Sequence, residues 1–457
     1  MRLGAIAFIV AVCCVPVCAQ AQTINDALVR AYQGNPQLNA ERARLRSTDE
    51  NVAQALSGYR PQISLGLTAG LMDVRNLMPG VTDTVTANLK PWSAGLTINQ
   101  TIFNGMKTGN QVRQAESQVQ SGREQLRGVE QNVLLDAVTA YMSVIANQSL
   151  VEAQKANVQF LREVVQTTHK RYDAGDVTPT DVAQSEARLN RGIADLNNAE
   201  VNYAISQATY TQVIGAPPGR LAPGEPIDRL LPRYREEAVA ITRREHPAIT
   251  AATLDIDVAQ RAVNIAEAAL YPTLGVQGNI SRGRQNDPTL GVTRQDQASV
   301  IANLNVPVYD GGQAASQVRQ AKEVQAQTRI VLDRVRAQSE TAVVAAWAVN
   351  EGSKVALNAA TSEVKAAELA VAGVQKEAQA GQRTTLDVLN SQQDLIGARS
   401  RLIVAQRDRV VASYTLFSAV GRLDHQKLAL RTPDYDAATH YHQVRDAWGG
   451  LRTPSGQ

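Results

Sequence analysis

The pentapeptide Gln111-Val112-Arg113-Gln114-Ala115 occurs a second time as Gln317-Val318-Arg319-Gln320-Ala321, at an offset of 206 positions. The same offset relates many other residues, so the match is not local. It pairs Ala174-Gly175 with Ala380-Gly381, Thr178 with Thr384, Asp181-Val182 with Asp387-Val388, Leu189 with Leu395 and Gly215 with Gly421. Self-similarity at a fixed offset indicates a repeated structural unit. We therefore interpret the chain as an internal duplication of one structural unit.

Upstream of the pentapeptide the offset becomes 211, because Asn35-Pro36 corresponds to His246-Pro247 and Pro61 to Pro272. The first half thus carries five extra residues before Phe103, a change that fits a loop. The prolines and glycines that follow Gly215 cannot continue a helix or a strand and indicate a linker. The predicted organisation is a first repeat at 22–214, a Pro-rich linker at 215–233, a second repeat at 234–421 and a flexible C-terminal tail at 422–457.

Residues 1–21 have the features of a secretory signal peptide. A basic start at Arg2 precedes an apolar run and the small residues Ala19-Gln20-Ala21, with cleavage expected after Ala21 or, alternatively, after Ala19. All three cysteines, Cys13, Cys14 and Cys18, lie in this segment, so the exported chain has no disulfide. Cys13 and Cys18 each follow a valine rather than a small residue, and Cys14 follows Cys13, which disfavours the alternative of a lipoprotein anchor.

Each repeat is predicted to begin with a helix followed by two strands. Asn35 ahead of Pro36 is a favourable helix start, and this helix should end near Ser57. After Pro61 apolar residues alternate with small polar ones, which is typical of strands. The pattern predicts one strand pair over about 61–103 and a second over about 272–309. Each strand has about ten residues, enough to cross a bilayer when tilted.

The remainder of each repeat is predicted to form a long helical hairpin, at 104–214 and 310–421. No proline interrupts the chain between Pro91 and Pro179 or between Pro307 and Pro433, and helix-forming residues dominate there. Helices over 107–172 and 313–378 would each rise about 100 Å at about 1.5 Å per residue. Gly175 and Gly381 should mark the turns between the two helices of each hairpin.

Composition excludes several classes of protein. Hydrophobic residues make up 44% of the chain and the formal charge is only +3, which disfavours wholesale disorder and a nucleic-acid-binding protein. The segment after the signal peptide contains no run of about 18 apolar residues, so insertion into a membrane would use strands. Four strands cannot close a barrel, and bacterial barrels have at least about eight, so chains would have to share one; a trimer would supply twelve. A soluble sandwich remains the alternative interpretation of the alternation.

Several motifs occur in order along the chain: Tyr59-Arg60-Pro61, Ile102-Phe103-Asn104-Gly105, Ile214-Gly215-Ala216-Pro217-Pro218-Gly219, Val306-Pro307-Val308-Tyr309-Asp310-Gly311-Gly312 and Ala380-Gly381-Gln382-Arg383-Thr384 with Asp387-Val388-Leu389. These motifs resemble those of the TolC family of outer-membrane channel-tunnels, over about residues 22–422. The resemblance implies an α+β membrane protein, in which a homotrimer forms a twelve-stranded barrel in the outer membrane, continuous with a helical tunnel across the periplasm. It also implies a passive, gated exit duct for drug efflux or type I secretion, served by a periplasmic adaptor and an inner-membrane pump.

The candidate gate lies at the two helical turns. Asp181 and Asp387 each follow a threonine by three residues, and this spacing by itself predicts helix capping. Arg383 breaks the repeat, since its counterpart is Val177. In the resembled family, the arginine matching Arg383 bonds to the pair matching Thr180-Asp181 of a neighbouring subunit, and Asp387 matches a pore-lining acid. Two further family positions differ: a second acid is replaced by Asn390 and a gate tyrosine by Ala378.

No catalytic residue, cofactor or metal is predicted. His440-Tyr441-His442 could place two imidazoles on one face of an extended segment, but a solvated segment is the favoured interpretation for this polar tail. Two other classes of protein remain as alternatives to the exit duct. A periplasmic adaptor would need one helical hairpin rather than two, and a general diffusion porin would not need the long helices.

Overall fold

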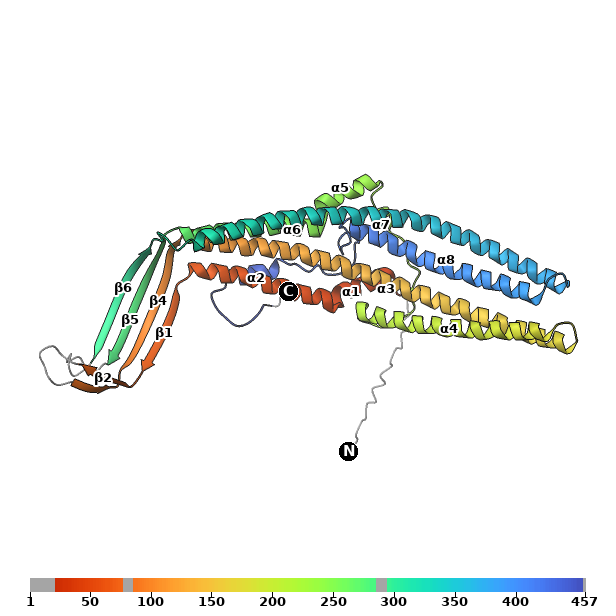
Figure 1. The fold of residues 1–457 in the computed structure, drawn as a ribbon, viewed down its shortest axis with the longest axis horizontal. Coiled ribbons are helices and arrows are strands. Elements are labelled where there is room, and N and C mark those ends of the chain that lie inside the picture. Colours follow the sequence, from red (N-terminus) through yellow and green to blue (C-terminus); the bar gives the residue numbers. More distant parts are fainter. Residues whose placement is uncertain (1–20, 77–84, 285–293, 455–457) are drawn as a thin grey trace, which may run out of the picture.

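The computed structural model describes residues 21–76, 85–284 and 294–454. The chain is elongated, with a β-sheet at one end and helices that extend from it to the opposite end (Figure 1). The predicted signal peptide, 1–21, lies outside the described residues except for Ala21.

Four long helices form two hairpins. Helix α3 (Lys107–Asp173) turns into α4 (Pro179–Ile214), and α7 (Gln313–Gln379) turns into α8 (Thr385–Ala419). Helices α3 and α7 have 67 residues each and end one residue beyond the predicted ranges, so the prediction of two long helices per chain is confirmed. Both hairpins extend away from the sheet in the same direction (Figure 1).

Shorter helices lie against the sheet-proximal halves of α3 and α7. Helix α1 (Ile24–Gly34) leads into α2 (Pro36–Leu56), and α5 (Arg235–Glu245) leads into α6 (Pro247–Glu267). The Asn35 side chain accepts a hydrogen bond from the Gln37 backbone at 2.9 Å, as the predicted N-cap requires. The remaining described helices are the single turns η1 (Ser57–Tyr59), η2 (Asp228–Leu230) and η3 (Ala268–Leu270), and α9 (Thr439–Val444) in the tail.

The predicted strands form one antiparallel sheet in the order β1-β4-β5-β6. Their bounds are Gln62–Ala69, Trp92–Asn104, Thr273–Arg284 and Gln295–Asn305. Two short strands, β2 (Met72–Asn76) and β3 (Val85–Leu89), form a separate hairpin that the sequence did not predict. In the sequence, this hairpin lies between β1 and β4, in the stretch where the first repeat carries its extra residues.

The sheet leaves apolar side chains uncovered. Strand β1 is exposed along its whole length, and the exposed fraction of Leu65 and Leu67 is 70% and 74%. Among the described residues, β1 and β6 each have a single neighbouring strand, so both are edges of the sheet. A sheet with an uncovered apolar face and two free edges is incomplete as a single soluble chain.

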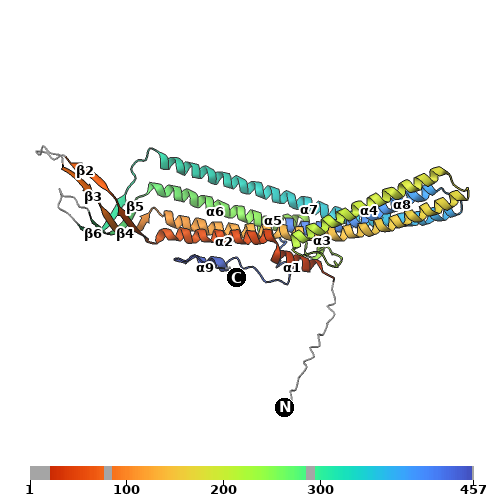
Figure 2. The ribbon, with the colours of Figure 1, turned by 90° about the horizontal axis from the view of Figure 1, so that it is seen from below.

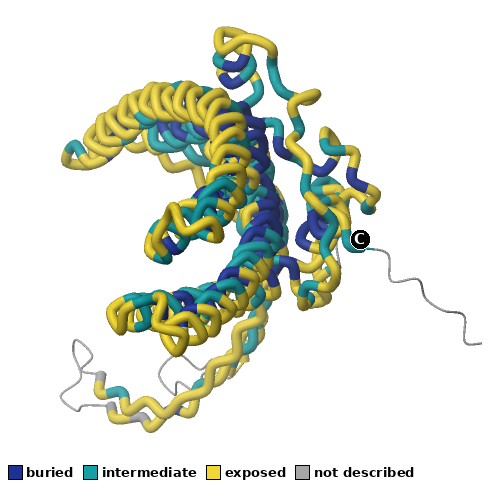
Figure 3. Tube along the Cα trace, turned by 90° about the vertical axis from the view of Figure 1, so that its right-hand side faces the viewer, coloured by how far each residue is buried: buried dark blue, intermediate teal, exposed yellow. Residues whose placement is uncertain are grey.

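Viewed along its length, the helical part is curved, and the C-terminal end lies on the convex side (Figure 3). The main hydrophobic core lies midway along the molecule, where α1, α3, α4 and α8 meet the tail. Within it, the Tyr141 hydroxyl donates to the carbonyl oxygens of Gln22 and Ala222, which fastens the start of the chain and the linker to α3. Burial raises the pKa of Tyr141 to about 12.

Helix α3 contains an 18-residue window whose mean hydropathy is high enough to cross a membrane, although polar residues such as Asp136 and Thr139 interrupt its apolar stretch. Half of that window is buried inside the structure. Buried residues of α3 such as Leu134 and Tyr141 belong to the main core. Packing among helices therefore accounts for the apolar character of α3.

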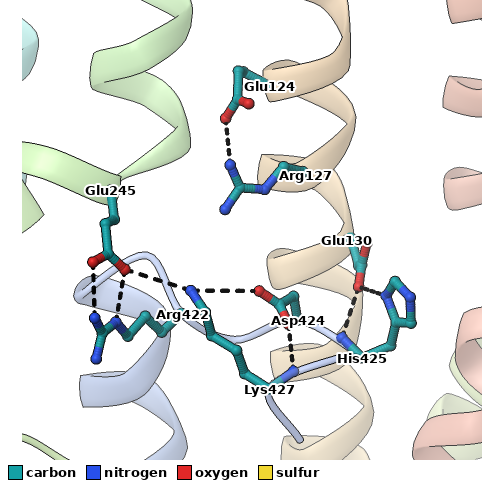
Figure 4. A network of polar contacts seen from close by, with 8 residues as sticks. All are labelled: Glu124, Arg127, Glu130, Glu245, Arg422, Asp424, His425 and Lys427. Carbon is teal, nitrogen blue, oxygen red and sulfur yellow. Dashed lines mark hydrogen bonds and ion pairs between the residues drawn. The ribbon is translucent and has the colours of Figure 1, made fainter. Parts of the chain in front are cut away.

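The prediction of a flexible tail is wrong. Leu423 is fully buried in the main core, and the tail continues alongside α2 as α9 (Figure 2). His425 is held by two carboxylates, Glu130 of α3 at 2.7 Å from Nδ1 and Asp434 at 2.8 Å from Nε2. Figure 4 shows the Glu130 contact beside a second one, in which Arg422 donates to Glu245 at 2.8 Å. The polar composition of the tail suggested a solvated segment, because Glu130 and Glu245 lie far from it in the sequence and could not be recognised as its partners.

His440 also departs from the prediction. Its side chain is 1% exposed, and Nδ1 lies 2.9 Å from Oδ2 of Asp49 on α2, whose side chain is equally buried. His440 is therefore not solvated, whereas His442 is exposed. The described residues contain no group of three or more potential metal ligands. Burial raises the pKa of Asp49 despite the hydrogen bond and charge of His440.

Candidate functional site

The candidate gate occupies the ends of the two hairpins farthest from the sheet. Each turn is closed by a glycine in the left-handed region, Gly175 at φ 81° and Gly381 at φ 76°. The backbone of Asp176 donates to Arg171 at 2.8 Å, and that of Gln382 donates to Glu377 at 2.9 Å. Such bonds satisfy the last carbonyl groups of α3 and α7. The two turns therefore have the same backbone, as the repeat predicted.

Both predicted capping boxes are confirmed. The Thr178 backbone donates to Asp181 at 3.0 Å, and the Asp181 backbone donates to the Thr178 hydroxyl at 3.3 Å. Thr384 and Asp387 make the same two bonds at 3.0 and 3.2 Å. Hydrogen bonds from the cap threonine lower the pKa of each aspartate, so both carboxylates stay ionised at neutral pH. Thr180 is exposed in the first turn of α4.

Arg383 contacts a residue that sequence reasoning missed. Its Nε donates to Oε2 of Glu377 at 2.9 Å, an exposed ion pair within one turn. Glu377 raises the pKa of Arg383 through this bond and its charge. The signal was available, because at the offset of 206 Glu377 corresponds to Arg171 just as Arg383 corresponds to Val177. Two charge differences between the repeats thus fall in the same turn and pair with each other.

Asn390 and Ala378 face the space between the two hairpins. The Oδ1 atom of Asn390 accepts a hydrogen bond from Arg188 at 3.0 Å, which joins α8 to α4. Ala378 lines a hollow between the hairpin ends together with Phe160, Val164 and Val388. A small residue at position 378 leaves this hollow open. Arg188 is a second functional candidate that the sequence did not single out.

The arrangement can hold charge but offers no catalytic chemistry. Two ionised, partly buried aspartates lie at the tips, together with the exposed pair of Arg383 and Glu377. Exposed ion pairs of this kind contribute little to stability and can exchange partners. Within one chain, Asp181 and Arg383 belong to different hairpins and have different partners, so the predicted contact between them would have to form across subunits.

Comparison with known proteins supports a channel architecture. The family model described as outer membrane efflux protein matches residues 27–216 and 239–422, which separates the two repeats. The outer membrane efflux protein BepC of Brucella suis is 39% identical over 96% of this chain and 94% of its own length. The outer membrane protein TolC of Vibrio cholerae is 24% identical over 89% and 92%. The solved structure of the CmeC outer membrane channel of Campylobacter jejuni matches with a TM-score of 0.79 at 13% identity, over 93% of this chain and 89% of that one.

Proposed function

The chain belongs to the outer membrane efflux protein family, and we propose that three copies form a passive, gated exit duct. It is an outer-membrane efflux channel with its helices in the periplasm, in a family of channels rather than enzymes. The trimer, the gate and the partners are what we propose beyond the family assignment. The observation that carries it is the four-stranded sheet with two free edges.

Closure of the sheet supports a trimer. In lipid, every backbone N–H and C=O must be paired, so the edges β1 and β6 require a partner strand. If β6 of one subunit pairs with β1 of the next, three subunits supply twelve strands, an even number within the range of outer-membrane barrels. The exposed face of β1 that carries Leu65 and Leu67 would then contact lipid. The concave side of the helical part would line the conduit (Figure 3).

Partners would supply the energy, since a passive duct has no source of its own. We expect an inner-membrane pump and a periplasmic adaptor whose helical hairpin docks between the tunnel helices. The surface between α7 and α8 is grooved, and the groove is lined by Val349, Ser353, Ala356, Arg401 and Val404. Drug efflux is the cargo class proposed first because the 39% identical relative from Brucella suis is named as an efflux protein. Protein secretion is the second.

The proposed gate pair is Arg383 with Asp181 of a neighbouring subunit, Thr180 lying beside it. In the isolated chain Arg383 pairs with Glu377, so Asp181 and Glu377 compete for one guanidinium. Asp387 and Asn390 would line the pore just inside the entrance, and of these two residues Asp387 is the charged one. An entrance locked by few exposed ion pairs should open with a small input of free energy.

Single-channel conductance in planar bilayers tests this gate. Arg383→Ala and Asp181→Asn should both raise the conductance, because each removes one partner of the bond between subunits. Val177→Ala, at the equivalent position of the other turn, is the matched control and should leave the conductance unchanged. If Glu377→Gln raises the conductance while Asp181→Asn does not, the lock lies within one chain and the proposed pair is wrong.

Susceptibility of a deletion strain tests the transport function. Loss of the duct should increase sensitivity to bile salts and dyes, and the wild-type gene should restore resistance. A deletion strain with unchanged sensitivity would favour a general diffusion porin. Recovery of the protein in the soluble periplasm would instead favour an adaptor.

A further inference from the structure

The end of the tail exposes two large apolar side chains. Trp448 is 77% exposed and Leu451 is fully exposed. Both follow α9, whose His440 is buried against α2, so they extend from a fixed segment. An exposed tryptophan on an anchored segment indicates a surface that meets an apolar environment.

Trp448 is held next to the start of the first strand. Arg60 donates from Nη1 to the Ala447 carbonyl at 2.5 Å, and its Cζ lies 4.7 Å from the centre of the Trp448 ring. Arg60 is separated from β1 only by Pro61. Through a hydrogen bond and a cation–π contact, this arginine therefore links the tail to the start of the sheet.

The junction of sheet and helices has the composition of a membrane interface. Tyr59, Phe103, Tyr271 and Tyr309 lie at the helix-proximal ends of the four strands and are between 41% and 85% exposed. Aromatic residues gather at the level of the lipid headgroups, where one end of the ring is apolar and the other hydrated. Trp448 continues this set. Arg60 places positive charge against its ring, and the exposed Arg452 follows four residues later in the chain, as anionic headgroups would require.

The tail lies on the convex side of the helical part, away from the concave side that would line the conduit (Figure 3). We propose that residues 447–452 form an interfacial anchor, in which Trp448 and Leu451 enter the periplasmic leaflet of the outer membrane. The occupant of this surface is lipid. The inference rests on the proposed insertion of the sheet, and the tail adds a contact with the bilayer outside the barrel.

Tryptophan quenching tests the anchor, since the chain has only three tryptophans, Trp92, Trp347 and Trp448. Three variants, each retaining one tryptophan with the others changed to phenylalanine, are reconstituted as full-length protein. The vesicles contain phosphatidylglycerol and phosphatidylcholine brominated near the glycerol end of its acyl chains. Trp448 should lose emission relative to unbrominated vesicles. Trp92, in β4, reports insertion of the sheet, and Trp347, in the helical part, should show no loss.

The outcomes separate the two proposals. Quenching of Trp92 without quenching of Trp448 overturns the anchor and leaves the inserted sheet intact. The same conclusion holds if a neighbouring subunit covers Trp448, because its emission would then shift to the blue without being quenched. Absence of quenching at both positions overturns the inserted sheet and the anchor with it. If a double variant does not fold, the difference between wild type and Trp448→Phe gives the same contribution of Trp448.

Discussion

At the residue scale, two buried histidines attach the tail to the body of the molecule. His440 is enclosed with Asp49, and His425 lies between Glu130 and Asp434. The ring of Tyr32 also packs on His425, with 4.4 Å between ring centres. These contacts give the tail a defined position. Because they involve titratable side chains, the attachment of the tail depends on pH.

His440→Ala should release α9. The change leaves Oδ2 of the buried Asp49 without its hydrogen bond, which costs about 2 kcal/mol. Hydrogen exchange of residues 439–444 measures the effect, and His442→Ala, an exposed histidine of the same helix, is the control. Equal protection in the two variants would contradict a role for the buried pair.

Tail attachment should weaken as pH rises. Burial lowers the pKa of His425, but hydrogen bonds and charge from Glu130 and Asp434 outweigh it and raise the pKa above 6.5. Because the folded state binds this proton more tightly than the unfolded one, the stabilisation is complete below 6.5 and is lost as pH rises through the folded pKa.

Protection of the tail from exchange, corrected for the intrinsic rate at each pH, reports this loss. His425→Gln should flatten the dependence, since glutamine does not titrate. A wild-type profile that does not fall above 6.5, or one that the variant reproduces, would exclude His425 as its source.

The sequence contained part of this detail. Capping at Thr178 and Thr384 was predictable because the cap and its aspartate are three residues apart. The Arg383–Glu377 pair could have been found by comparing the repeats residue by residue. The partner of His440 could not, because Asp49 is nearly four hundred positions away and leaves no local pattern.

At the scale of elements, prolines and glycines set the helix limits. Absence of proline allowed α3 and α7 to run for 67 residues, and glycines with positive φ end them. The β2–β3 hairpin was missed because each of its strands has only five residues, although apolar and polar residues alternate in both. The sequence therefore predicts long periodic elements better than short ones.

Gly215 caps the C-terminus of α4, and Gly421, its equivalent in the second repeat, follows the C-cap of α8. Their φ angles are 84° and 85°. A Cβ at Gly421 would lie 2.8 Å from the Cα of His246, whereas nothing lies within 4 Å at Gly215. Gly215→Ala should cost about 1–2 kcal/mol for its left-handed backbone. Gly421→Ala should cost more, because the backbone of His246 must also move. Thermal unfolding of the two variants compares them, and equal midpoints would be inconsistent with the contact.

At the scale of the whole molecule, repetition supplies most of the architecture. Two copies of a strand pair and a helical hairpin give a curved wall with a sheet at one end (Figure 1). The need for further subunits follows from counting strands, because four cannot close a barrel. The path of the tail could not be predicted, since it depends on contacts made only after both repeats have folded.

Disulfide cross-linking tests closure of the sheet. All three native cysteines precede residue 22, so a cysteine in β1 and another in β6 report only the engineered contact. Thr68→Cys combined with cysteines scanned along β6 around Ser299 should give covalent dimers and trimers on oxidation, and nothing larger. Each single-cysteine variant is the control. A ladder extending beyond the trimer would indicate an open assembly rather than a ring.

The pairing of β4 with β5 bears on the timing of assembly. Asn104 of β4 pairs with Thr273 of β5, so the two central strands of the sheet lie far apart in the sequence. They are therefore exported at different times. A contact between distant parts of a chain forms late, because the intervening loop must close first. The first repeat would therefore cross the periplasm with β1 and β4 as a lone hairpin, which is marginally stable in water. Commitment to the bilayer waits for the second half of the chain, so a prematurely terminated polypeptide would remain an unassembled periplasmic substrate for proteases.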